Sequence, residues 1–380
     1  MIKPLFKYAG GKFKEYNHIN RFFPEKINNY YEPFVGGGGV MFQLHNNKKI
    51  DGRIFINDFS KSLIDFYKCL SDKDFAKELY NISDAWDKID VFSERISDKY
   101  GQYFDEIVRN RLDKEFVTKE LYNEISHFCE NLDYNMHHFD LRAEIVNGLL
   151  DKIRRFKKKD LDNDGRQTSF KCITTSIHQS FYFIVRRMYN EWNNNGNEAE
   201  YTIKERSAQW FFIREFCFGS MFRYDSKGNF NVPYGGFGYN KKCFTCKIEN
   251  ILNDEVNKLF AENVTLSCSD FEEEIKRHNY CDDDLIFLDP PYDSTFSEYD
   301  DNSFTREDHI RLEKTLRDVK CKWIMAIGKT DFISNLYKDY NVLEYDKTYA
   351  YQARGTYDNK KTTHLLISNY KNLLRENPPL

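Results

Sequence analysis

The tetrapeptide Asp289-Pro290-Pro291-Tyr292 combines residue types that suit chemistry on an amino group. It follows an apolar run, residues 285–288, with the length and composition of a buried strand. Two prolines fix backbone φ angles and stiffen the turn. The Asp289 carboxylate and the Pro290 carbonyl can both accept hydrogen bonds from one exocyclic NH2 group, and Tyr292 can stack on the attached ring. The alternative interpretation is a rigid surface turn.

An amino group on a planar base is a poor nucleophile because its lone pair is delocalised into the ring. Two acceptors localise that lone pair and stabilise the positive charge that develops on nitrogen during group transfer. The sequence therefore predicts a catalytic site formed by Asp289, Pro290, Pro291 and Tyr292.

A second chemical pattern lies near the start of the chain, where strand-like residues 30–35 run into four glycines that begin at Gly36. Glycine lets the backbone approach a bound cofactor closely, although a tight turn gives the same pattern. No Gly-Lys-Ser/Thr follows, so this is not a Walker phosphate loop. Asp58 ends the next strand-like segment, residues 53–56, where nucleotide-binding folds place an acid against ribose hydroxyls. An Asp in a surface turn is the alternative, but the preceding glycines favour a cofactor site.

The elements that must position these residues have an α/β order. Strand, glycine turn, helix, strand and acid in residues 30–70 are typical of a nucleotide-binding βαβ unit. Helical spacing replaces strand patterns in residues 71–159, and turn residues 225–228 indicate a β-hairpin over residues 223–233. Strand patterns resume at residues 264–266, 285–288, 322–327 and 364–367. We predict an α/β domain, residues 1–70 and 251–380, interrupted by a mainly helical inserted domain, residues 71–250.

The distribution of charge separates this insertion from the rest of the chain. The protein has a net charge of −4, yet residues 152–247 carry 18 Lys and Arg against 9 Asp and Glu, a net charge of +9. The net charge argues against a nucleic-acid partner, whereas the local excess favours one. A solvated helical surface would account for the same charges.

Composition places the chain among intracellular globular proteins. No apolar run reaches the roughly 18–20 residues that span a bilayer, and the first residues lack the apolar core of a signal peptide. The 9 cysteines are scattered except for Cys243 and Cys246, so no disulfide framework is expected. We therefore expect a cytoplasmic protein without a membrane partner.

Several motifs together resemble one family, the alpha-class adenine-N6 DNA methyltransferases, which include the bacterial DNA adenine methylase. They occur in the family's order: Phe6-Lys7-Tyr8-Ala9-Gly10-Gly11-Lys12, Tyr31-Glu32-Pro33-Phe34-Val35-Gly36-Gly37-Gly38, Asn57-Asp58 and Asp289-Pro290-Pro291-Tyr292. The hairpin from Arg223 to Gly235 is also similar. Most of residues 71–215 shows no such likeness. The chain is longer than a minimal member, and the excess lies between residue 71 and about residue 200.

The resemblance implies an S-adenosylmethionine-dependent methyltransferase with a Rossmann-like class I fold. It implies that Tyr8, Ala9, Gly10 and Lys12 lie over the methionine portion of the cofactor, and that Phe34, Gly36 and Gly38 form its floor. Asp58 would bind the ribose hydroxyls, Asp270 and Phe271 would lie beside the cofactor adenine, and Asp289 would also bind the cofactor. Asp270 could instead be a simple helix cap.

The resemblance also implies double-stranded DNA as the partner and the inserted domain as the part that recognises the target. The target adenine would leave the base stack to reach Asp289. Candidate DNA contacts are Lys7, Arg223, Lys227, Asn229, Lys157, Lys158 and Lys159. A cognate restriction endonuclease is a possible further partner, and no metal is expected.

Alternatives remain within the same fold: methylation of cytosine N4, of RNA or of a protein side-chain amide. A DNA-binding module without activity is a further alternative, although Asp289 and Tyr292 argue against it. Residues 160–165 match half of an EF-hand loop, but Lys171 stands where its bidentate glutamate belongs. Cys243 and Cys246 could form half of a zinc site, but no second pair follows at ligand spacing.

Overall fold

A computed structural model describes most of the chain as two compact units. The described residues are 1–8, 10–13, 15–110, 116–155, 165–195, 202–221, 223–236, 243–293, 304–348 and 361–371. The first unit joins Met1–Ser71 to Leu252–Leu380, and the second comprises Asp72–Ile251. The first unit thus contains both segments that carry the chemical motifs.

The first unit is built on a seven-stranded sheet in the order β3-β2-β1-β4-β5-β7-β6. All neighbours are parallel except β7, which runs antiparallel to both β5 and β6. This mixed α/β arrangement is consistent with a class I methyltransferase fold. The strands are β1 (Tyr30–Glu32), β2 (Ile54–Asn57), β3 (Val264–Ser267), β4 (Leu285–Leu288), β5 (Lys322–Gly328), β6 (Asn341–Thr348) and β7 (Lys361–Ser368).

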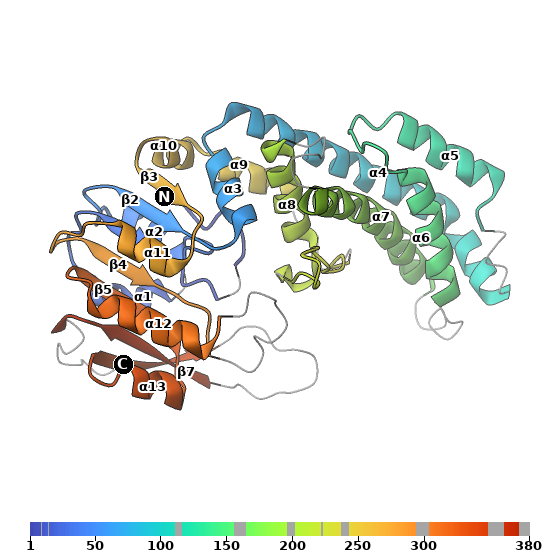
Figure 1. The fold of residues 1–380 in the computed structure, drawn as a ribbon. Helices are drawn as coiled ribbons and strands as arrows, with labels where there is room; N and C mark the ends of the chain where they lie inside the picture. Colours follow the sequence, from blue (N-terminus) through green and yellow to red (C-terminus); the bar gives the residue numbers. More distant parts are fainter. Residues whose placement is uncertain are drawn as a thin grey trace. The chain divides into compact units, whose positions relative to one another are not determined.

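Helices cover both faces of this sheet (Figure 1). On one face lie α11 (Phe271–Arg277), α12 (Arg306–Arg317) and α13 (Asp331–Leu336). The other face carries α1 (Tyr16–Ile19), the short 3-10 helix η1 (Asn20–Phe22), α2 (Gly39–Asn46), α3 (Lys61–Cys69) and α10 (Asp254–Glu262). β4 is buried at every position, and its alternate side chains serve the two faces: Ile286 and Leu288 join the α12 side, whereas Phe287 packs on Phe23. A strand buried on both faces reads as a continuous apolar run, which is why the sequence revealed it.

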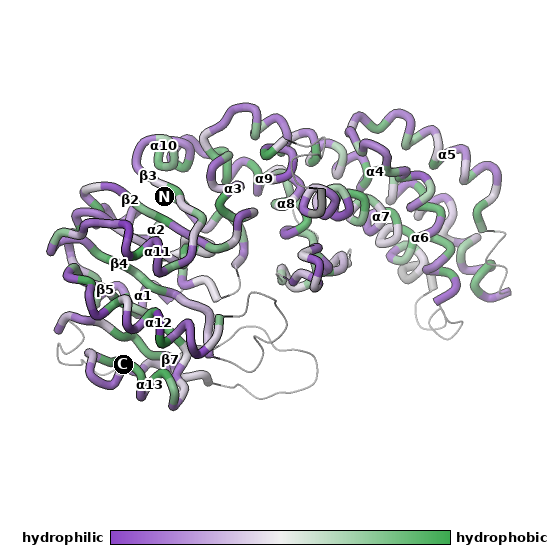
Figure 2. Tube along the Cα trace, viewed as in Figure 1, coloured by the Kyte–Doolittle hydropathy of each residue, from purple (hydrophilic) through white to green (hydrophobic). Residues whose placement is uncertain are grey.

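The second unit is helical. Its elements are α4 (Lys73–Asn110), α5 (Lys119–Glu130), α6 (Leu141–Arg155), α7 (Gly165–Asn195), α8 (Ile203–Phe216), the 3-10 helix η5 (Phe218–Ser220) and α9 (Phe244–Ile251). Apolar residues recur along α4 every three or four positions, and Figure 2 shows the resulting alternation of green and purple. That stripe packs α4 along α7 and α8. Thr202 begins α8 with a capping box to Glu205.

The predicted hairpin at residues 223–233 is a turn with little regular strand. Gly228 N donates to the Asp225 carbonyl at 2.8 Å, as a tight turn requires. One isolated bridge, Tyr224 with Phe230, joins the described arms, and a second bridge joins Tyr234 to Cys217 at the end of α8. The prediction was therefore correct for the turn and wrong for a continuous β-ladder.

The structure also bears on what the sequence indicated about the cysteines, metal ligands and membrane-spanning helices. Cys243 and Cys246 form a disulfide, so they are not half of a zinc site, and the other seven cysteines are free. Within the described ranges, no group of three His, Cys, Asp or Glu side chains is placed to hold a metal ion. Among the described helices, none has both the length and the apolar character needed to cross a bilayer. The EF-hand-like residues 160–164 lie outside the described residues.

Candidate active site

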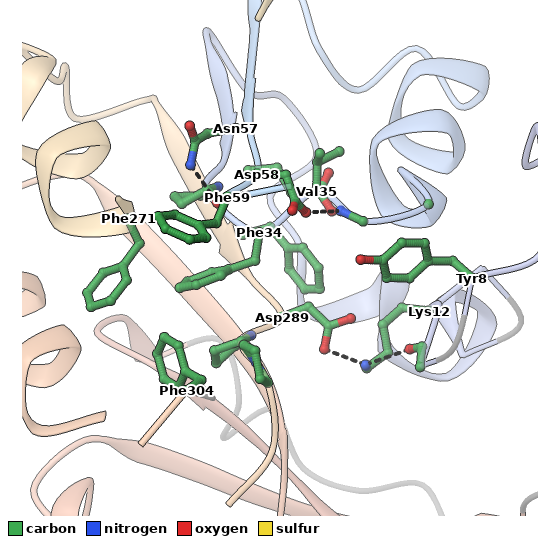
Figure 3. A pocket seen from close by; sticks show the side chains of 18 of the residues that line it. Tyr8, Lys12, Phe34, Val35, Asn57, Asp58, Phe59, Phe271, Asp289 and Phe304 are labelled. Carbon is green, nitrogen blue, oxygen red and sulfur yellow. Dashed lines mark hydrogen bonds and ion pairs between the residues drawn. The ribbon is translucent and has the colours of Figure 1, made fainter. Parts of the chain in front are cut away.

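The first unit contains a cavity of about 620 Å³ at the carboxyl ends of β1 and β4. Strand order reverses between these two neighbours, which is where open α/β sheets bind ligands. Figure 3 shows Phe34, Phe271 and Phe304 on one side of the cavity and Tyr8 and Lys12 on the other. The lining includes nearly all predicted catalytic and cofactor residues that are described: Tyr8, Gly10, Lys12, Phe34, Gly36, Asp58, Asp270, Phe271, Asp289, Pro290, Pro291 and Tyr292.

The glycine turn between β1 and α2 is compact because two of its residues adopt left-handed backbone angles. Gly36 has φ +46° and Gly38 has φ +64°, conformations that L side chains rarely adopt. A Cβ at Gly36 would also lie 2.8 Å from the Tyr8 ring. The glycines therefore let the turn pack directly against the segment that contains Tyr8, a packing role that the sequence did not indicate.

Asp58 lies at the end of β2 and helps to shape this turn. Its carboxylate accepts hydrogen bonds from Gly36 N at 3.0 Å and from Ser60 N at 2.9 Å. Burial raises its pKa, while these two backbone bonds oppose that rise. The preceding Asn57 is buried and bonds to the carbonyls of Pro33 and Ser269, so it ties the ends of β1, β2 and β3 together.

Aromatic rings form one wall of the cavity. The centroids of Phe34, Phe271 and Phe304 lie 5.5–5.7 Å from one another. Arg311 lies over Phe271, 4.4 Å from its centroid, and pairs with both Asp270 carboxylate oxygens at 2.9 Å. Asp270 also caps α11 by accepting from Glu272 N at 2.9 Å. The helix-cap interpretation of Asp270 is thus confirmed, although the residue also lines the cavity.

Asp289 faces the cavity from the end of β4 and is paired with Lys12. The Lys12 ammonium donates to Asp289 Oδ1 at 2.5 Å and to the Gly10 carbonyl at 3.0 Å. The Lys12 side chain is 1% exposed, and that of Asp289 is 20% exposed. Lys12 Nζ also lies 5.2 Å from the centroid of the Tyr292 ring. The pairing joins two predicted site residues, 277 positions apart, whose contact no sequence pattern indicated.

The Tyr292 ring is held from behind by β5 and β7. It packs edge-on against His364 at 5.3 Å, and a Cβ at Gly328 would lie only 3.3 Å from it. His364 is fully buried and packs in turn against Tyr345, whose hydroxyl donates to Glu15 at 3.1 Å. A rigid ring beside Asp289 is what a stacking surface requires.

Glu32 is a cavity residue that sequence analysis did not single out as functional. It is buried at the end of β1 and accepts a hydrogen bond from the Tyr30 hydroxyl at 2.9 Å. Burial raises its pKa well above the usual range, with the hydrogen bond from Tyr30 and the charge of Lys12 acting in the opposite direction. Phe59, Phe304, Asp308 and Arg311 were missed as well, because no local motif marks them.

Of the predicted DNA-binding residues, those that the structure describes do not line this cavity. Lys7 is exposed in the first unit. Arg223, Lys227 and Asn229 belong to the turn at residues 223–233 in the second unit, where the Arg223 guanidinium bonds to Asn231 at 2.7 Å. The remaining predicted site residues, Ala9, Lys157, Lys158 and Lys159, lie outside the described residues.

An α/β sheet with a glycine turn, a buried acid and an Asp-Pro-Pro-Tyr segment around one cavity is the arrangement of an amino-group methyltransferase of the class I type. Residues 8–351 match the D12 class N6 adenine-specific DNA methyltransferases, and the chain belongs to this family. The resemblance found in the sequence is thereby confirmed. The family is adenine-specific and acts on DNA, which decides against cytosine N4, RNA or a protein amide as the substrate.

Two curated relatives are similar along nearly their whole length. The type II methyltransferase M.MjaIII of Methanocaldococcus jannaschii is 27% identical over 97% of this chain and 99% of its own. M1.LlaDCHI of Lactococcus lactis subsp. cremoris is 23% identical over 98% of this chain and 96% of its own. M.CviBI of Paramecium bursaria Chlorella virus NC1A is 37% identical, over 43% of this chain and 61% of its own. The protein is thus a site-specific DNA adenine methyltransferase with type II restriction-modification relatives.

Proposed function

We propose that this adenine methyltransferase takes its methyl group from S-adenosylmethionine and transfers it to an adenine flipped out of double-stranded DNA. One observation carries the proposal: Asp289 faces the same cavity as the glycine turn, the buried Asp58 and the aromatic wall. The same cavity therefore contains an acceptor for the target amine, Asp289, and residues that suit a nucleoside cofactor.

The residues of the cavity fit S-adenosylmethionine. The three phenylalanines offer flat apolar surface to an adenine ring, and Asp58 offers a carboxylate to ribose hydroxyls at a strand end. The glycine turn provides backbone without side-chain bulk. We assign cofactor binding to Tyr8, Ala9, Gly10, Lys12, Phe34, Gly36, Gly38, Asp58, Asp270, Phe271 and Asp289. When bound, the cofactor supplies a methyl group that is activated by a positively charged sulfur.

Asp289 and the Pro290 carbonyl are assigned to the target amine. Both accept hydrogen bonds from N6, which directs the nitrogen lone pair toward the incoming methyl carbon. As the nitrogen–carbon bond forms, the bond between that carbon and the donor sulfur breaks, and its electron pair stays on sulfur. Positive charge then grows on nitrogen, and the negative Asp289 carboxylate would stabilise it. The nitrogen finally loses one proton, for which Asp289 is the nearest assigned acceptor. Pro291 stiffens the turn, and Tyr292 stacks on the flipped base.

Lys12 contributes to the same step through Asp289. Its ammonium group balances the charge of a carboxylate that is mostly removed from water, and it holds that carboxylate through Oδ1. This role is supported by the short contact between Nζ and Oδ1, and it comes in addition to the role near the cofactor that the resemblance implied.

The second unit is assigned to target recognition. This assignment is supported by the excess of positive charge in residues 152–247 and by the exposed turn that bears Lys227. Lys7, Arg223, Asn229, Lys157, Lys158 and Lys159 are the further proposed DNA contacts. We further propose that the protein is cytoplasmic and has a cognate restriction endonuclease as a partner, a proposal in keeping with relatives that are named type II methyltransferases.

Methylation-sensitive sequencing of DNA from cells that express the chain tests this proposal. Cells with the unchanged protein should gain N6-methyladenine at one recurrent short sequence, and cells with the variant Asp289→Ala should not. Methylation without a recurrent sequence would remove target recognition from the proposal. Equal methylation by the variant would remove the assigned role of Asp289.

A further inference from the structure

Side chains on one face of helix α7 form hydrogen bonds with the backbone of the turn at residues 223–234. Tyr182, Arg186 and Asn190 are spaced by four residues and therefore share a helix face. The Tyr182 hydroxyl donates to the Val232 carbonyl at 2.8 Å, and Arg186 Nη1 donates to the same oxygen at 3.1 Å. We call Tyr182, Arg186 and Asn190 the α7 stripe.

Asn190 bonds to both backbone polar groups of one residue of the turn, Phe230. Its Nδ2 donates to the Phe230 carbonyl at 3.0 Å, and its Oδ1 accepts from Phe230 N at 2.8 Å. The Phe230 side chain is 1% exposed, so water cannot readily replace this support. Both backbone groups would lose their protein partner if the Asn190 amide were removed.

The α7 stripe matters because the arms of the turn pair over a short length only, so contacts with the rest of the second unit determine where the turn lies. A single isolated bridge, Tyr224 with Phe230, joins its described arms, which leaves no continuous ladder to hold the register. Asp225 organises the tip by accepting at 2.9 Å from the backbone N of Lys227 and of Asn229. The tip therefore has a defined shape. The α7 stripe places the returning arm on the second unit together with two backbone bonds, from Phe218 N to the Pro233 carbonyl at 2.8 Å and from Gly235 N to the Phe216 carbonyl at 2.9 Å.

Phe230, Val232 and Tyr234 are buried at alternate positions, which keeps one face of the returning arm against the helices. Lys227, at the tip, is exposed. A rotation of this arm would move the side chains of Lys227 and Asn229 away from any base edge that they contact. Such a contact discriminates by hydrogen-bond geometry, so small displacements reduce it.

We propose that Tyr182, Arg186 and Asn190 are positioning residues for sequence recognition: they hold the 223–234 turn at the angle from which it reads the target. This inference rests on the proposed role of the turn in base contact. It predicts that the α7 stripe controls the choice of DNA sequence although none of its three residues needs to touch DNA.

The test compares kcat/KM on the cognate duplex with kcat/KM on a duplex altered at one base pair of the recognition sequence. Asn190→Ala should lower this discrimination by about tenfold, because one good base contact accounts for a factor of that order. Tyr182→Phe should lower it less, since Val232 keeps its bond from Arg186. Arg187→Ala is the matched control. Arg187 lies on the same helix and pairs with Glu144, and it should leave the discrimination within about twofold.

A double-mutant cycle separates positioning from a general loss of structure. In a protein that already carries Lys227→Ala and Asn229→Ala, adding Asn190→Ala should cause no further loss of discrimination. Suppose that the double variant Lys227→Ala with Asn229→Ala, the tip variant, lowers discrimination between the two duplexes but Asn190→Ala and Tyr182→Phe do not. The positioning proposal is then overturned, and the recognition role of the turn stands. If the tip variant itself changes nothing, the recognition role is wrong, and the positioning proposal is overturned with it. A further loss from Asn190→Ala in the tip variant would also overturn positioning.

Discussion

Replacement of Lys12 by methionine removes a buried charge and keeps most of the side-chain volume. The Lys12 ammonium is 1% exposed and lies 2.5 Å from Asp289 Oδ1. Removing one partner of a buried ion pair costs about 3–5 kcal/mol because the other charge remains without compensation. Asp289 is 20% exposed toward the cavity, where water screens part of that charge. We therefore expect a loss of about 2–3 kcal/mol, below the range for a fully buried pair.

The assay is differential scanning calorimetry, which can resolve separate transitions of the two units. For a unit of this size, the expected loss lowers the midpoint temperature by roughly 5–10 °C. Asp289→Asn alone should destabilise as well, because it leaves a buried ammonium group. The double variant, Lys12→Met with Asp289→Asn, should lose less stability than the two single variants lose when their losses are added. Lys7→Met, an exposed lysine in the same motif, should change stability by about 0.5 kcal/mol or less.

Strict additivity of the two substitutions would show that Lys12 and Asp289 are not coupled. An unchanged midpoint for Lys12→Met would show that the ammonium does not compensate a buried carboxylate. Either result would refute the role assigned to Lys12.

Three further predictions concern the cofactor and the DNA. Asp58→Asn should weaken binding of S-adenosylmethionine in calorimetric titrations, because it removes a charge-assisted acceptor. In the unchanged protein, binding should weaken as the pH falls, and it should do so at a higher pH than for an exposed Asp, because the pKa of Asp58 is raised. The variant should lose this pH dependence. Gly36→Ala should reduce both cofactor affinity and stability, the latter by about 1–2 kcal/mol from its left-handed backbone alone, whereas unchanged binding would separate this turn from the cofactor. Neutralising Lys157, Lys158 and Lys159 together should weaken binding to all duplexes alike and flatten its salt dependence, and an undiminished slope would place the phosphate contacts elsewhere.

Strands with a continuous apolar character could be predicted from the sequence, and β6 could not. β4 and β5 are buried along nearly their whole length, so their composition marks them. β6 lies at the sheet edge and alternates partly buried with exposed residues, among them Val342 at 38% exposed. β1 is shorter than predicted, since it ends at Glu32 before a proline, which cannot donate to a ladder.

Within the site, the sequence could identify only those residues that belong to a recognisable motif. Asp58 and Asp289 follow strands whose ends meet at the cavity, so their proximity follows from the α/β order. Phe304 lies just before α12 and Arg311 lies within it, and only the packing of that helix brings them to the cavity. The pairing of Lys12 with Asp289 likewise depends on the fold of the first unit, which brings together residues 277 positions apart.

A single-turnover measurement with labelled S-adenosylmethionine and cognate duplex tests the central claim most directly. The unchanged protein should place the label on adenine N6, identified by mass spectrometry of the released nucleosides. Asp289→Ala should retain its fold by circular dichroism and slow this step by about 10²-fold or more, the loss expected when one group that stabilises developing charge is removed. A folded Asp289→Ala variant that methylates adenine at a near-normal rate would contradict the account.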